Sequence, residues 1–146
     1  MTTSREARDA IVSHFLAGFH SLRSDPVAFD NAAGMVGPGG APAAKPDRAP
    51  WAWLVIEMEN AELITLGRQG NRRFRQYGNV LFDIFIPTGR GDGEAYAIAD
   101  AAASVLRGAT VGGVRLSEPE GPSAVGTAGA WFRLRLETEF SFDMIA

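Results

Sequence analysis

The strongest constraint on the fold is a run of alternating residues at positions 131–142. Over this stretch, apolar side chains alternate with charged or hydroxyl side chains. A period of two places the apolar side chains on one face of a β-strand and the polar ones on the other. The sequence therefore predicts a strand with one buried face, and the core side holds Phe132, Leu134, Leu136, Phe140 and Phe142.

Two further segments alternate in the same way and predict neighbouring strands. Residues 74–87 carry four apolar residues in alternation before the closing Pro87. Residues 51–59 place Trp51 and Trp53 on the side opposite the predicted core. Weaker signals predict short strands at 62–66 and 111–116, a polar turn at 67–71 and a turn-rich loop at 118–129.

Two segments predict helices. The first starts at a capping box formed by Thr3 and Glu6 and ends before Pro26, because the residue before a proline is pushed out of the helical region. The second lies between the glycine-rich loop at 89–93 and Gly108. Each has an apolar stripe with a spacing of three or four residues. The stripes are Ala7, Ile11, Phe15, Gly18, Phe19 and Leu22 in the first, and Ala95, Ile98, Ala99, Ala102, Val105 and Leu106 in the second.

The order of these elements predicts a single α+β domain at residues 1–146, with a mainly antiparallel sheet and two helices packed on one face. Residues 34–50 interrupt this order of helices and strands. They are rich in glycine, proline and alanine and have no apolar period, which is typical of a long loop. We expect a flexible segment that becomes ordered against a partner.

Composition excludes several classes of protein. The chain has no cysteine, which excludes disulfides, thiolate metal sites and a cysteine nucleophile. Its net charge of −3 argues against a protein that coats nucleic acid. No segment approaches the roughly 20 apolar residues of a membrane span, and the polar N-terminal residues are unlike an export signal. We therefore expect no membrane partner and assembly in the cytoplasm.

No catalytic, cofactor or metal site is expected. The glycines at 89–93 resemble a phosphate-binding turn, but Glu94 and Ala95 stand where a P-loop needs a lysine and a hydroxyl. The simpler interpretation is a turn with Asp92 capping the following helix. Glu57 and Glu59 share one face of a strand, which a solvated surface explains. The sequence predicts a protein that is not an enzyme.

A group of arginines with aromatic neighbours is the strongest candidate for an interface. Arg68, Arg72, Arg73 and Arg75 surround Phe74 in the predicted hairpin. Arginine with aromatic residues is the usual composition of protein interfaces, but a solvated hairpin or a nucleic-acid contact would use the same residues. Trp51 and Trp53, on the side opposite the predicted core, are further interface candidates.

The run from Gly78 to Gly91, GNVLFDIFIPTGRG, followed by an alanine-rich helix, resembles the tail terminator and tail-completion proteins of long-tailed bacteriophages. The likeness in element order extends from about Arg5 to Phe142. It implies a homo-hexameric ring in the virion tail that caps the tail tube and stops its polymerisation. The implied partners are the major tail tube protein and a head-completion or neck protein, with nucleic acid at most passing through the lumen. The family has no catalytic residues to transfer.

Two alternatives remain open. One is a neck or head-completion protein, and the other is a small ligand-binding or nucleic-acid-binding domain that uses the hairpin at 68–75. Within the leading hypothesis, we expect this hairpin to bind the end of the tail tube, because its arginines suit carboxylates on a protein partner.

Overall fold

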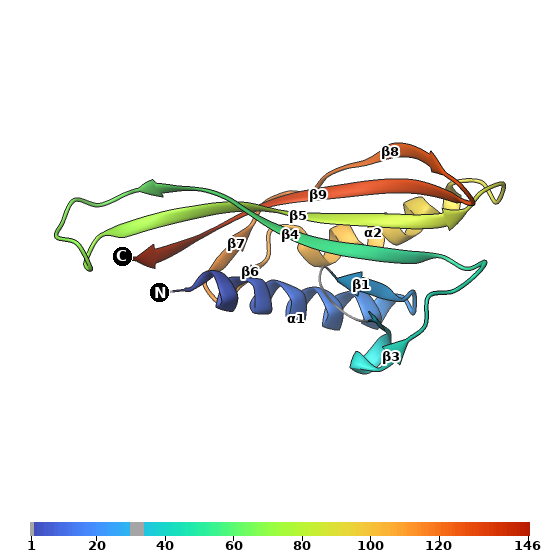
Figure 1. Ribbon diagram of the computed structural model, residues 1–146, viewed down its shortest axis with the longest axis horizontal. Helices are drawn as coiled ribbons and strands as arrows, with labels where there is room; N and C mark the ends of the chain where they lie inside the picture. Colours follow the sequence, from blue (N-terminus) through green and yellow to red (C-terminus); the bar gives the residue numbers. More distant parts are fainter. Residues whose placement is uncertain (1, 30–33) are drawn as a thin grey trace.

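The computed structural model describes residues 2–29 and 34–146 and shows a long twisted sheet with both helices beneath one face (Figure 1). The helices are α1 (Ser4–Leu22) and α2 (Gly93–Leu106). They pack closely, because a methyl group added to Gly18 of α1 would collide with Val105 of α2. This arrangement confirms the predicted α+β fold with a mainly antiparallel sheet and two helices on one face.

Three long strands form the body of the sheet: β4 (Trp51–Leu63), β5 (Arg73–Pro87) and β9 (Trp131–Ile145). β5 lies between the other two and is antiparallel to both. Among the described residues, nine strands share one sheet in the order β3-β2-β1-β4-β5-β9-β7-β6, and β8 also pairs with β9. The short strands are β1 (Val27–Phe29), β2 (Met35–Val36), β3 (Pro42–Ala43), β6 (Thr110–Val111), β7 (Val114–Leu116) and β8 (Glu120–Ala128).

The core lies between the helices and the face of the sheet that they cover. The alternating residues of β5 and β9 and the helical stripes meet there as predicted, and the rings of Phe15, Phe19 and Phe82 pack with centroid distances of 4.9 to 5.4 Å. Burial of such side chains is the main favourable term in folding. Thr3 caps α1 by accepting a hydrogen bond from the Glu6 amide at 3.1 Å, which confirms the predicted helix start.

Two predictions for the strands need correction. Residues 62–66 do not form a separate strand, because β4 continues to Leu63 through an irregularity between Met58 and Ala61. At this irregularity, β4 has one residue more than the facing stretch of β5. The extra residue breaks the period of two without ending the strand. Residues 118–129, predicted as a loop, contain β8. Most side chains of β8 are exposed, so it has no apolar alternation to reveal it.

The short segments also differ from prediction. Residues 34–50 contain β2, β3 and one turn of 3-10 helix (η1, Pro38–Gly40), which are too short to create a periodic signal. Residues 111–116 belong to a tight β6–β7 hairpin whose turn has Gly112 and Gly113 at positive φ. In α1, Leu22 is 59% exposed rather than part of the buried stripe. Asp92 precedes α2 but makes no side-chain capping hydrogen bond.

The helices leave two surfaces of the sheet uncovered. One is the face opposite the helices, which we call the outer face. The other is the β4–β5 hairpin, which extends past the N-terminal end of α1 in Figure 1. The last seven residues of β4 are exposed, in contrast to its buried start. The residues that the sequence predicts as an interface lie on these two surfaces.

Candidate interface on the hairpin and the outer sheet face

The hairpin loop between β4 and β5 is a defined turn. The Ile64 amide donates to the Arg73 carbonyl at 3.0 Å, and the Arg73 amide donates to the Thr65 hydroxyl at 2.8 Å. Arg72 and Ala146 exchange backbone hydrogen bonds at 3.1 and 2.9 Å, so β9 supports the base of the loop. Leu66 is 96% exposed within this turn. A polar, hydrogen-bonded turn that presents a leucine to solvent is suited to contact another protein.

The structure divides the predicted arginine group into two sets. Arg68 and Arg73 are exposed at the turn, and the guanidinium of Arg72 lies 5.5 Å from the centre of the half-buried Phe74 ring. These three arginines, which we call the arginine tip, form no ion pair with any residue in the described part of the chain. Arg75, which the sequence grouped with them, is paired within its own sheet.

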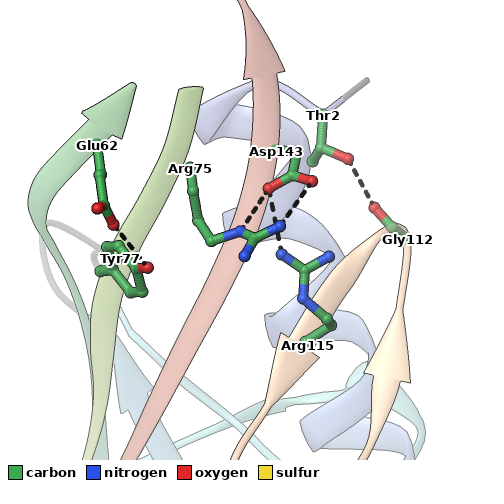
Figure 2. Close-up of polar contacts among 7 residues, drawn as sticks. All are labelled: Thr2, Glu62, Arg75, Tyr77, Gly112, Arg115 and Asp143. Carbon is green, nitrogen blue, oxygen red and sulfur yellow. Dashed lines mark hydrogen bonds and ion pairs between the residues drawn. The ribbon is translucent and has the colours of Figure 1, made fainter. Parts of the chain in front are cut away.

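Arg75 belongs to an ion cluster centred on Asp143 (Figure 2). Its Nε donates to Asp143 Oδ1 at 2.9 Å, and Arg115 of β7 reaches the same oxygen at 3.2 Å. The hydrogen bond from Arg75 lowers the pKa of Asp143, burial opposes it, and Arg115 lowers it further. The cluster ties β5, β9 and β7 together. Arg75 therefore has a role within the sheet, and its role in an interface stays a prediction.

Of the two predicted tryptophan anchors, Trp51 already has aromatic contacts within its own chain. Trp51 stacks on Phe85 with centroids 4.1 Å apart and meets Trp131 edge-on at 6.0 Å. The Lys45 ammonium lies 4.7 Å from the centre of the Trp51 ring, a cation–π contact. Trp51 and Trp53 are both half-buried. The segment at 34–50, for which the sequence suggested no burial within its own fold, thus reaches the outer face through Lys45.

Next to this aromatic group, Asp83 lies on the outer face between two arginines of β9. Arg133 Nε donates to Asp83 Oδ2 at 3.1 Å, and Arg135 Nε donates to Oδ1 at 2.8 Å. The Asp83 side chain is only 2% exposed. Burial alone would raise the pKa of Asp83, but the hydrogen bonds and charges of Arg135 and Arg133 outweigh it and lower the pKa. This arrangement keeps a buried carboxylate ionised.

Further along the outer face, the strand register gathers five glutamates. Glu57 and Glu139 flank Asn79 in one row, and Glu137 pairs with Glu120 in a neighbouring position. Glu59 accepts a hydrogen bond from the Asn79 amide. We call these residues the acidic band: Glu57, Glu59, Glu120, Glu137 and Glu139. None of them forms an ion pair within the described chain.

A surface hollow of about 290 Å³ opens beside the acidic band, lined in part by Glu59, Asn60, Tyr77 and Glu139. Sequence reasoning had noted Glu57 and Glu59 on one face but missed the band as a whole. The band depends on the register between β4, β5, β9 and β8, and alternation within one strand carries no information about register.

Among residues 2–29 and 34–146, no group of three or more His, Cys, Asp or Glu side chains is arranged to hold a metal ion. Neither helix in this described part of the chain is long and apolar enough to cross a membrane.

Comparison with known proteins gives a likeness of fold. No family model and no curated protein matches the sequence. One solved structure, whose name describes no activity, aligns over 100% of this chain and 99% of its own with a TM-score of 0.66 and 15% identity. A chain of the structure named "Virion of native gene transfer agent (GTA) particle" aligns over 94% of both chains with a TM-score of 0.53 and 14% identity. At these identities, the likeness shows a shared fold.

Proposed function

We propose that this chain is a structural virion protein that forms a ring on the end of a tail tube, stops tube polymerisation and joins the tail to the head. The observation that carries the proposal is the shared fold with a chain of a gene transfer agent virion, over 94% of both chains. The resemblance of the 78–91 run to phage tail terminators agrees with it. The role is structural rather than catalytic.

The uncovered surfaces give this role a physical basis. Tube subunits add by presenting the same surface repeatedly, so a terminator complements that surface on one side and fails to reproduce it on the other. An uncovered sheet face and a projecting hairpin supply two different contact surfaces on one subunit. The proposed partners are other copies of the chain, the major tail tube protein and a head-completion protein, with nucleic acid at most passing through the ring.

Deletion of the gene from its parent virus tests the proposal. Without a terminator, we expect overlong or uncapped tails in electron micrographs, and few tails joined to heads. Supply of the wild-type chain from a plasmid should restore tail length, and Gly93→Ala serves as a matched variant because an added methyl there meets no atom within 4 Å. Tails of normal length that join heads normally in the deletion strain would exclude the proposal.

The position of the protein in the particle separates the tail role from the neck alternative. A gold-labelled antibody against the chain should mark the head-proximal end of free tails. Label on tail-free heads alone would assign the chain to the neck instead.

A further inference from the structure

Opposite charges are segregated on this molecule. The arginine tip carries three positive charges at the end of the hairpin, and the acidic band carries five negative charges on the outer face. Arg73 and Asn79, which mark the two regions on β5, are six residues apart. At about 3.4 Å per residue, this separation is roughly 20 Å, so the centres of the two groups lie well apart within one copy.

Apolar residues accompany both charged groups. Leu66, 96% exposed, stands beside the arginine tip. On the outer face, the half-buried Val55 and Leu81 pair in the row that also contains Glu137. An apolar centre with a charged rim is the usual composition of a protein interface. The hollow beside Glu59 and Glu139 offers room for a guanidinium between carboxylates.

We propose that the arginine tip of one copy docks on the acidic band of a second copy. Charge complementarity selects this occupant: each copy carries both halves of the match, and neither half forms an ion pair within the described chain. The contact is head-to-tail, and a head-to-tail contact closes into a ring when its rotation allows. The proposal deepens the proposed function by naming the contact between ring subunits.

Charge reversal on purified protein tests the contact. The tip variant is Arg68→Glu with Arg73→Glu, which spares the half-buried Arg72, and the band variant is Glu57→Lys with Glu120→Lys and Glu139→Lys; all five side chains are exposed. Each variant places like charges at the contact, so we expect self-association measured by sedimentation velocity to weaken at least about tenfold. Arg5→Glu with Arg8→Glu on α1 makes the same change in net charge as the tip variant, but away from the contact, and should associate like the wild type.

The mixture of the two variants provides the decisive arm. In a mixed assembly, a negative tip meets a positive band and a positive tip meets a negative band, so association should return to the wild-type level. Circular dichroism and cooperative melting establish that each variant is folded. Wild-type protein that is monomeric at every concentration, variants that associate normally, or a mixture that fails to associate would each overturn the proposal.

Cysteine cross-linking gives a second measurement, which does not depend on whether the charge-reversal variants fold. The natural chain has no cysteine, so Arg68→Cys and Glu139→Cys place one thiol each on the tip and on the band. A mixture should form the mixed disulfide dimer in preference to either homodimer. Equal yields of all three dimers would count against the contact.

These solution assays are independent of tail assembly, so they separate the contact from the proposed function. If the mixture of variants associates in solution but the deletion strain makes normal tails, the contact between copies is supported and the proposed role in the tail is excluded. If the tip variant associates normally in solution but yields overlong tails, the tail tube protein is the occupant of the tip and this inference is wrong.

Discussion

Two carboxylates bridge arginines across the same pair of strands, but in different surroundings. Asp83 lies on β5 and holds Arg133 and Arg135 of β9, whereas Asp143 lies on β9 and holds Arg75 of β5. The Asp83 side chain is 2% exposed, and that of Asp143 is 18% exposed. The first cluster sits in the middle of the sheet, and the second lies near the projecting hairpin.

Similar ion pairs between the same two strands are therefore expected to differ in how much they contribute to stability. A buried carboxylate depends on its partners, because the loss of either side leaves an uncompensated charge. A more exposed cluster is screened by water and contributes less to stability. The middle of the sheet is therefore expected to carry the stability of the domain, and the hairpin end is expected to tolerate change.

The glycine between the two clusters gives the largest expected effect. Gly78 lies on β5 between Arg75 and Asp83, and an added methyl would collide with the carbonyl oxygen of Glu57 and with the Phe140 ring. We expect Gly78→Ala to lower the free energy of unfolding by about 3 kcal/mol, the upper end for overpacking, because one obstacle is backbone. Urea denaturation measures it.

Gly93→Ala is the matched control for this prediction. Gly93 begins α2, and an added methyl there meets no atom within 4 Å. The change should be neutral or raise the free energy of unfolding by up to about 1 kcal/mol. Equal stability of the two variants would show that Phe140 does not pack tightly over Gly78.

Removal of the buried carboxylate ranks second. Asp83→Ala leaves Arg133 and Arg135 side by side without a counter-charge. Because both arginines are about 30% exposed, we expect a loss of about 2 kcal/mol, below the range for a fully buried pair. Chemical denaturation at neutral pH measures the change. A loss no greater than that of Asp143→Ala would refute the contrast between the two clusters.

Acid sensitivity sharpens the same comparison. The pKa of Asp83 is lowered in the folded protein, so its contribution to stability is complete above the unfolded aspartate pKa of about 3.9 and is lost as the pH falls through the lower folded value. We therefore expect the free energy of unfolding of the wild type to fall below about pH 4, and Asp83→Asn to show a shallower fall. Urea titrations at pH 7, 4 and 3 provide the measurement, and parallel curves would contradict it.

The smallest effect is expected at the hairpin end. Asp143→Ala releases Arg75 and Arg115 into solvent, where water replaces the lost partner. The free energy of unfolding should change by less than about 1 kcal/mol. Thermal melts of Asp143→Ala and Asp83→Ala in parallel make the comparison direct, and a larger drop for Asp143→Ala would reverse the order proposed here.

Much of the fold was accessible from local sequence patterns. Alternation identified the buried faces of β5 and β9, and the Thr3 box identified the start of α1. The misses have a common cause. β8 and the strands within residues 34–50 are short or exposed, so partner strands rather than their own apolar pattern define them.

Only part of the candidate interface could be predicted from the sequence. The arginines at positions 68, 72 and 73 are neighbours in the sequence, so the pattern located the arginine tip. Arg75 could not be separated from them, because its partner Asp143 is 68 residues away. The acidic band was missed for the same reason, since Glu57 and Glu139 meet only through Asn79 of the strand between them.

The sequence by itself determined which face of each long strand is buried, where the helices begin and that a cluster of arginines lies at a turn. These properties depend on periods of two and 3.6 residues and on neighbours within one turn of chain. The tertiary structure alone decided which strands pair, in which register, and therefore which charges are neutralised and which remain for a partner. Register is a contact between distant residues, and one strand carries the same alternation whatever it pairs with.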